Sequence, residues 1–293
     1  MKSTKFANIS LMIFYFRHSY ILIFTALVVA CSGNGGGTTN DACVGFECEI
    51  QNLMTVEKIY NDVINKEMLS LLDDIYASDV ISNNPDIPSG IEGFRGYYTN
   101  LLAENPLMTA TTKHVVGDGE YVAIHWHYSA TPENEKSGFA KVDLLRLDEG
   151  LIVEYWDASM ETFPETVSGN SVFSDLYDYG DTQENRSLDV EEENKEIVTD
   201  FYMRTFNDMD LDLFDSLVDM NYLQHNQFFP NGTELLRDAI EVGRLGSVNV
   251  FLSLAEGDLV WTFRRSSNGN LSVVDLWRFD NNINRIVEHW DVL

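Results

Sequence analysis

Cysteine is scarce in this chain: its 293 residues include three, and all of them lie at or before Cys48. So few cysteines exclude a disulfide-dense scaffold, and we expect the folded part of the chain to contain none. Cys43 and Cys48 are spaced so that they can close a small disulfide loop in an oxidising compartment, or they remain unlinked thiols. No histidine lies near them in the sequence, so they do not form a zinc site.

Positive charge is also scarce. Lysine and arginine together number 19 against 47 aspartates and glutamates, which gives a net charge of −28. Such a chain repels phosphate backbones and anionic lipid headgroups, so nucleic acid is not expected as a partner. The sequence also lacks a Walker loop, a dinucleotide glycine fingerprint, an HExxH motif and a serine elbow. Nucleotide-binding, zinc-protease and serine-hydrolase functions therefore lack their motifs, and no cofactor is expected.

The amino end carries an apolar run from Tyr20 to Ala30. This run is too short to span a bilayer but matches the apolar core of a signal peptide. The sequence Val-Val-Ala-Cys at residues 28–31 resembles a bacterial lipobox, which predicts cleavage before Cys31 and lipidation of that cysteine. The alternative is that residues 11–30 remain as one membrane anchor, although charged and polar side chains interrupt this segment.

A glycine-rich segment follows at residues 32–40 and has the composition of a flexible tether. We therefore expect a lipoprotein signal peptide at residues 1–30 and a tether at residues 31–50. A lipid on Cys31 would hold the protein in the bacterial cell envelope, on the periplasmic or the outer-membrane face. The membrane is thus an expected partner through this anchor.

An internal repeat organises the rest of the chain. Residues 52–94 align with residues 194–236 without a gap, with identities such as Tyr60 with Tyr202 and Asn84 with Asn226. The repeat is much longer than the units of about 20–50 residues that build solenoids. It therefore predicts a duplicated domain.

The expected domains are a first copy at residues 51–163, an irregular acidic linker at 164–191 and a second copy at 192–293. Helical periodicity opens each copy, as at residues 56–64 and 198–206. Capping boxes, Ser89-x-x-Glu92 and Asn231-x-x-Glu234, predict the start of a later helix.

Alternation of apolar and polar residues then predicts strands in the first copy at residues 121–129, 139–147 and 151–157. Helices followed by hairpin-linked strands predict an α+β fold, with an antiparallel sheet covered by helices on one face.

Several short motifs resemble the SnoaL-like polyketide cyclases, a family of the nuclear transport factor 2-like superfamily. They lie at residues 118–127, 142–146, 222–226 and 286–291, and residues 164–170 resemble the tail that follows the last strand in that family. The resemblance implies two tandem conical barrels, each a curved antiparallel sheet wrapped around helices and a deep, mostly apolar pocket. Family members commonly form dimers, so we expect a monomer whose two copies pack as an intramolecular pseudo-dimer.

Candidate catalytic residues lie in the second copy. Proton abstraction beside a carbonyl needs a base in a water-poor cavity, and Asp275 lies among apolar neighbours on a predicted strand. Asp291 is a second candidate base, and it shares a strand face with His289. His225 follows the second predicted helix and His289 lies on the last predicted strand, so in a conical barrel the two could converge on one pocket. The resemblance implies that His225, the histidine of its motif, lies near the cavity mouth. The alternative for each residue is a structural hydrogen bond in the core.

Six further residues are assigned to ligand binding or to the pocket wall: Asp143, Asp157, His125, His127, Trp156 and Trp290. His125 and His127 share one strand face, but without a third ligand no metal site is expected. In the first copy, Asn83 and Tyr155 replace the two histidines of the second copy.

Two functions therefore remain open. The first is a small-molecule enzyme with cofactor-free acid and base chemistry, of the aldol cyclase or isomerase type, with the second copy as its active pocket. The second is a non-catalytic module that binds a lipophilic ligand, since many members of the resembling family have no known activity. Either way, the expected ligand is a small apolar or carbonyl-containing compound.

Overall fold

A computed structural model describes residues 45–179, 186–266 and 269–293 of the chain, and the structural statements below refer to these residues. The predicted signal peptide, Cys31, Cys43 and most of the predicted tether lie outside them. Cys48 is disulfide-bonded and lies in the first helix, so the expectation of a folded part without cysteine is wrong. No helix in the described ranges combines the length and apolar character needed to cross a membrane.

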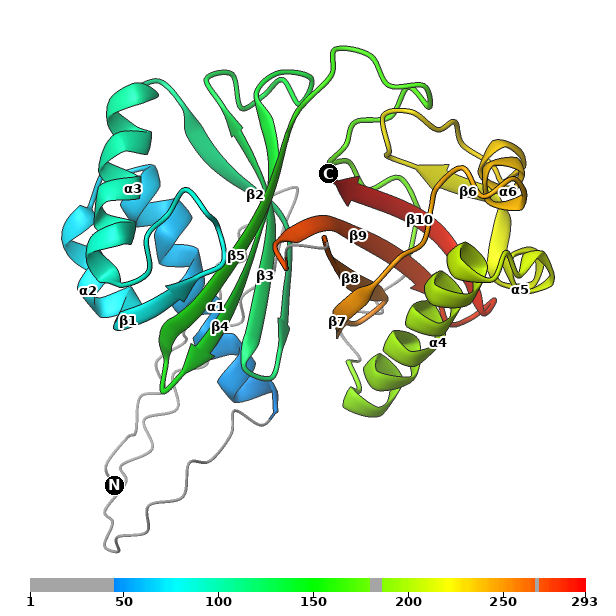
Figure 1. Cartoon of the computed structure of the whole chain (residues 1–293), viewed down its shortest axis with the longest axis horizontal. Helices are drawn as coiled ribbons and strands as arrows, with labels where there is room; N and C mark the ends of the chain where they lie inside the picture. The colour runs from blue at the N-terminus through cyan, green and yellow to red at the C-terminus, as the bar shows by residue number, and fades with distance from the viewer. Residues whose placement is uncertain (1–44, 180–185, 267–268) are drawn as a thin grey trace, which may run out of the picture. The chain divides into compact units, whose positions relative to one another are not determined.

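The first half of the described chain contains helices followed by strands (Figure 1). Its elements are α1 (Phe46–Lys58), which continues as a π-helical segment (Ile59–Ile64), a 3-10 turn (Leu69–Leu71), α2 (Leu72–Ile75), β1 (Tyr76–Ser82), α3 (Ile91–Glu104), β2 (Thr109–Asp118), β3 (Tyr121–Ser129), β4 (Phe139–Asp148) and β5 (Leu151–Glu161). The predicted strands correspond to β3, β4 and β5, while β1 and β2 were not predicted.

The second half repeats this order. Its elements are α4 (Leu188–Asn207), α5 (Leu211–Leu217), β6 (Val218–Gln224), α6 (Glu234–Glu241), β7 (Val250–Glu256), β8 (Leu259–Arg265), β9 (Leu271–Asp280) and β10 (Arg285–Val292). Helix α4 begins within the segment that the sequence assigned to the linker. Between β5 and α4 the described residues form neither helix nor strand.

Each half forms one five-stranded sheet, in the order β1-β5-β4-β3-β2 and β6-β10-β9-β8-β7. The α+β class is confirmed. Both sheets are mixed rather than wholly antiparallel, because the edge strands β1 and β6 pair in parallel with β5 and β10. The helices α1 to α3 cover one face of the first sheet, and α4 to α6 cover one face of the second (Figure 1).

The faces of the two sheets that are not covered by helices pack against each other. A shared apolar cluster joins residues such as Val142, Leu144 and Trp156 of the first sheet to Trp261, Leu276 and Trp290 of the second. Each sheet is therefore buried on both faces. Between its sheet and its helices, each half has a separate apolar cluster, and we call this region the interior of that half.

The two predicted capping boxes are wrong. Helix α3 begins after Gly90 and α6 after Thr233, and neither residue caps its helix with a side chain. Ser89 Oγ instead accepts a hydrogen bond from the backbone N–H of Ser82, and Asn231 Oδ1 accepts one from Gln224. Both side chains thus hold the loop against the end of the parallel edge strand, a long-range contact that local spacing does not reveal.

Candidate functional site

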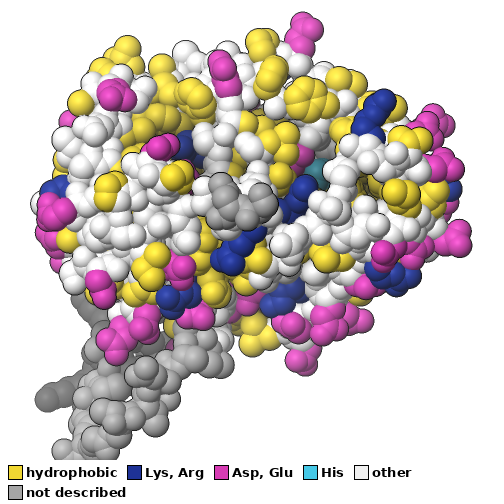
Figure 2. Space-filling view, in the orientation of Figure 1, with side chains coloured by type: hydrophobic (Ala, Val, Ile, Leu, Met, Phe, Trp, Pro, Cys, Tyr) yellow, Lys and Arg dark blue, Asp and Glu magenta, His cyan; other side chains and the backbone are white. Residues whose placement is uncertain are grey.

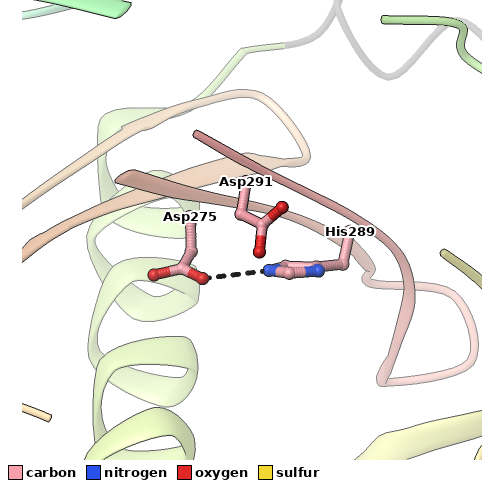
Figure 3. Close-up of side chains that lie close together, drawn as sticks. All are labelled: Asp275, His289 and Asp291. Carbon is pink, nitrogen blue, oxygen red and sulfur yellow. Dashed lines mark hydrogen bonds and ion pairs between the residues drawn. The ribbon is translucent and has the colours of Figure 1, made fainter. Parts of the chain in front are cut away.

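Three titratable side chains meet on the helix-facing side of the second sheet (Figure 3). Asp275 on β9 is paired directly with Asp291 on β10, so their side chains point to the same face. His289 lies two residues before Asp291 on β10 and therefore faces the same way. The structure therefore brings Asp275, Asp291 and His289 together, and their catalytic roles stay predictions.

The imidazole of His289 is fixed at both nitrogens. Its Nδ1 lies 2.9 Å from Gln224 Oε1, and that oxygen also accepts the backbone N–H of Asn226. An oxygen that already accepts a hydrogen bond is an acceptor, so Nδ1 carries a proton and donates it. The other nitrogen, Nε2, lies 3.2 Å from Asp275 Oδ1. Both atoms are acceptors when unprotonated, so the pair must hold one proton between them.

A chain of donors supports the other oxygen of Asp275. The hydroxyl of Tyr202, on α4, donates to Asp275 Oδ2 at 2.8 Å. Arg264 Nη1, on β8, donates in turn to the Tyr202 hydroxyl oxygen at 3.1 Å. Because this oxygen accepts from arginine, the tyrosine proton is directed at the carboxylate.

Asp291 is only half satisfied. Its Oδ2 accepts a hydrogen bond of 2.5 Å from Asn226 Nδ2, whose own oxygen is fixed because it accepts the N–H of Phe228. Its Oδ1 is buried and has no hydrogen-bond partner among the described residues. Burial raises the pKa of Asp291 to about 6, against the lowering effect of His289 and Arg264.

Aromatic side chains enclose the three residues. The Trp277 ring centroid lies 4.2 Å from that of His289, and the Tyr222 ring stacks at 6.4 Å. Asp275, His289 and Asp291 are each 4–6% exposed. The carboxylates therefore lie in a largely water-excluded environment, where electrostatic interactions are strong.

One ligand atom from each of Asp275, His289 and Asp291 lies within 4.8 Å of the others, so the three could hold a metal ion. The 3.2 Å separation of His289 Nε2 and Asp275 Oδ1 is a hydrogen-bond distance. A metal ion there would have to displace the proton that the pair shares, and it would lie near the Arg264 cation. The arrangement therefore fits a proton better than a metal ion.

The first half repeats the carboxylates but not the imidazole. Asp143 is paired with Asp157, and Asn84 donates to Asp157 as Asn226 does to Asp291. The hydroxyls of Tyr60 and Tyr155 donate to the two oxygens of Asp143 at 2.6 and 3.0 Å. Burial raises the pKa of Asp143 to about 6 and raises that of Asp157. Both oxygens of Asp143 are thus occupied by phenols.

His225 does not join the cluster, so its predicted convergence with His289 is wrong. Its Nε2 lies 2.8 Å from Glu288 Oε1, and its ring stacks on Trp290 at 4.8 Å. Glu288 and Trp290 alternate with His289 and Asp291 along β10, so they point to the opposite face. His225 therefore belongs to the packing between the sheets.

Four residues assigned to ligand binding also lie on that opposite face. His125 and His127 contact the ring of Phe173 from the connecting segment, with centroids 5.0 and 4.8 Å apart. Trp156 and Trp290 belong to the apolar cluster between the sheets. The strand alternation that turns Asp143 toward the helices turns these side chains away from them, so they do not line the same interior.

The sequence interpretation did not assign a role to Tyr202, Gln224, Asn226 or Arg264. Two of them carried a signal: Tyr202 and Asn226 match Tyr60 and Asn84 in the repeat, and these side chains make the same contacts in both halves. Gln224 and Arg264 have no identical counterpart, because Ser82 and Trp126 occupy the matching places.

No curated protein matches the chain. Among solved structures, the chain is similar to IdmH of Streptomyces antibioticus (24% identity over 37% of this chain and 91% of that one, TM-score 0.31). It is also similar to a SnoaL-like polyketide cyclase of Agrobacterium tumefaciens (17% over 36% and 88%, TM-score 0.31). A nuclear transport factor 2-like protein of Mesorhizobium loti matches at 19% identity over 38% and 93%, with a TM-score of 0.32. The family model of the SnoaL-like polyketide cyclases matches residues 54–159, which confirms the predicted resemblance for the first half of the chain.

Proposed function

We propose that the second half is a cofactor-free acid and base site for a small carbonyl compound, of the cyclase or isomerase type. The observation that carries this proposal is the buried Oδ1 of Asp291, which has no partner among the described residues, beside the 3.2 Å contact of His289 Nε2 with Asp275 Oδ1. The match of residues 54–159 to the SnoaL-like polyketide cyclases favours a cyclase, an isomerase or a ligand-binding protein.

In the proposed reaction, Asp291 acts as the base. Its free oxygen takes a proton from the carbon next to the carbonyl, so the C–H electron pair becomes the enolate and Asp291 becomes a neutral acid. The enolate then regains a proton at another position, or its carbon attacks a second carbonyl in the same molecule. A pKa of about 6 leaves Asp291 ionised at neutral pH yet basic enough to accept that proton.

His289 and Asp275 hold the second proton of the cycle. Tyr202 and Gln224 fix the pair from both sides, so the imidazole needs no reorganisation during the reaction. The proton between Nε2 and Oδ1 is available to an oxyanion that forms beside it. The surrounding Trp277 and Tyr222 rings favour an apolar substrate body.

Non-catalytic ligand binding is the alternative function, and the first half favours it. The two phenols on Asp143 take the place of the imidazole partner that Asp275 has in the second half. Both halves together would then comprise one catalytic and one binding interior.

Hydrogen exchange tests the catalytic proposal without knowledge of the natural substrate. Methyl 4-oxo-4-phenylbutanoate in D₂O is the probe, and NMR measures the exchange of the protons next to its ketone. We expect the wild-type protein to accelerate this exchange and Asp291→Asn to lower the rate by about 10² or more. The matched control is Asp157→Asn, the same change in the first half, which should leave the rate unchanged. Equal rates in wild type and Asp291→Asn would contradict the proposal.

A further inference from the structure

Arg264 is a cation on the helix-facing side of the second sheet. Its neighbour two residues before on β8, Thr262, is paired with Asp275, so both side chains and Arg264 point to the same interior. Arg264 Nη1 donates to Tyr202 at 3.1 Å, and the guanidinium lies 5.9 Å from the centre of the Tyr202 ring. The side chain is half-buried.

In the described part of the chain, Arg264 has no carboxylate partner. Among the described residues, no Asp or Glu oxygen lies within the 4.0 Å ion-pair distance of Arg264. Several other arginines of this chain, whose surface carries many acidic side chains (Figure 2), are paired: Arg146 with Glu154, Arg237 with Asp215 and Arg278 with Glu288. Arg244 and Arg265 also lack an ion pair among the described residues, but both are exposed to solvent. An inward-facing arginine that is held only by a neutral phenol leaves most of its donors for another group.

The first half also has a cation in the matching cross-strand pair, but on the opposite strand of that pair. Arg264 faces Val273 across the β8–β9 pair, and the matching pair of the first sheet is Trp126 with Lys141. Lys141 Nζ lies 5.5 Å from the Trp126 ring, and it too has no ion-pair partner among the described residues. Within the described ranges, each half thus holds a cation without an ion-pair partner in this cross-strand pair, near its paired aspartates.

We propose that the ligand of the second half carries a carboxylate and that Arg264 anchors it. With Nη1 on Tyr202, the guanidinium still presents Nη2 and Nε, the donors that a planar carboxylate accepts in pairs. The proposal rests on the proposed function, because it concerns the ligand of the same site. It adds the substrate class: a carbonyl compound with an apolar body and one anionic end.

Binding of 4-oxo-4-phenylbutanoate and of its methyl ester tests this proposal, because the two probes differ by one charge. We expect the full-length protein to bind the acid at least about tenfold more tightly than the ester, the effect of one charge-assisted contact. The NMR signals of the His289 imidazole follow each titration, so the measurement reports on the second half alone.

Arg264→Gln should weaken binding of the acid to the level of the ester and leave binding of the ester unchanged, while Arg264→Lys should keep part of the preference. The matched control is Arg265→Gln, because Arg265 points to the other face and stacks on Phe251 with 3.8 Å from its guanidinium to the ring centre. This control should keep the full preference for the acid. Equal binding of both probes, binding of neither, or an unchanged preference in Arg264→Gln would overturn the proposal.

Thermal melting of Arg264→Gln and hydrogen exchange on both probes complete the experiment. If Arg264→Gln does not fold, as thermal melting would show, Arg264→Lys and the acid-to-ester ratio of the wild type decide the outcome. Hydrogen exchange on the same probes separates this proposal from the catalytic one. A preference for the acid without exchange would support the anion site and contradict the proposed catalysis, and exchange without such a preference would do the reverse.

Discussion

Asp118 and Glu256 make the same contact in opposite directions. Asp118 is the last residue of β2, an edge strand of the first sheet, and Glu256 is the last residue of β7, the matching edge strand of the second sheet. Asp118 Oδ2 accepts the backbone N–H of Ala255 at 3.1 Å, and Glu256 Oε2 accepts that of Gly117 at 3.0 Å. Such a reciprocal pair is what a two-fold axis generates in a dimer. It supports the proposal of an intramolecular pseudo-dimer.

The first prediction concerns this reciprocal contact. Asp118→Ala and Glu256→Ala should each lower the free energy of unfolding by about 1–3 kcal/mol, because each leaves a backbone N–H without its acceptor. Urea denaturation measures the change, and the exposed Glu120→Ala on the same hairpin is the control, expected within about 0.5 kcal/mol of wild type. Light scattering that gave twice the mass of one chain would contradict the pseudo-dimer.

The second prediction concerns the pH dependence of exchange. The carboxylate form of Asp291 is the base, so the exchange rate should rise with pH through about 6 and then level off. Arg264 lowers the pKa of Asp291, so Arg264→Gln should move the midpoint of the profile to higher pH. Rates measured from acid to neutral pH check both statements, and a profile that falls with pH would contradict them.

The third prediction exchanges the residue on the last strand of each half that differs between the two carboxylate sites. His289→Tyr gives the second half the tyrosine that the first half has at Tyr155, and it should reduce exchange by about 10² or more because the shared proton is lost. Tyr155→His should not create activity in the first half. Ser82 stands there in place of Gln224, which contacts the imidazole, and Trp126 in place of Arg264, which donates to Tyr202. The test uses a Tyr155→His, Asp291→Asn double variant, in which the second half lacks its base. Accelerated exchange by this variant would show that the first half has become active and would contradict the prediction.

The fourth prediction concerns stability. The pKa of Asp143 is raised to about 6 in the folded chain, so between pH 4 and 6 the folded state binds more protons than the unfolded state. The free energy of unfolding therefore falls as pH rises through this window. Asp143→Asn cannot ionise, so relative to wild type it should gain about 3 kcal/mol between pH 4 and pH 8. Urea unfolding at both pH values measures this gain, and equal differences at the two would refute it.

The fifth prediction concerns Cys31, which lies outside the described residues. We propose that a lipid on this cysteine anchors the protein in the cell envelope. Cys31→Ala should then release the protein from the membrane fraction or leave it unprocessed, as fractionation and the mass of the chain would show. Wild-type protein found entirely in the cytosol would contradict the anchor.

The repeat and the strand alternation were enough to predict the α+β class and the shared strand face of His289 and Asp291. Period two determines which residues share a face, and the pairing of β9 with β10 brings those faces into register. The edge strands β1 and β6 were missed because each follows directly on a short helix, α2 or α5, without a turn signal between them.

Alternation could not tell the two faces of each sheet apart, because both are buried. Trp290 and Asp291 are adjacent on β10, and one faces the other sheet while the other faces the helices. His225 follows the end of β6, where its backbone N–H donates to His289 but its side chain pairs with Glu288. Its position therefore depends on a sheet-to-sheet contact that no local pattern in the sequence encodes.

Because the two halves belong to one polypeptide and differ in sequence, their interiors can have different functions. In a dimer of identical chains, a change at one site appears at both, so the two interiors must serve the same purpose. Here the position that holds Tyr155 in one half holds His289 in the other, although the supporting Tyr60 and Tyr202 are alike. One interior can thus retain its carboxylate as a rigid support while the other acquires reactivity, and dilution cannot separate them.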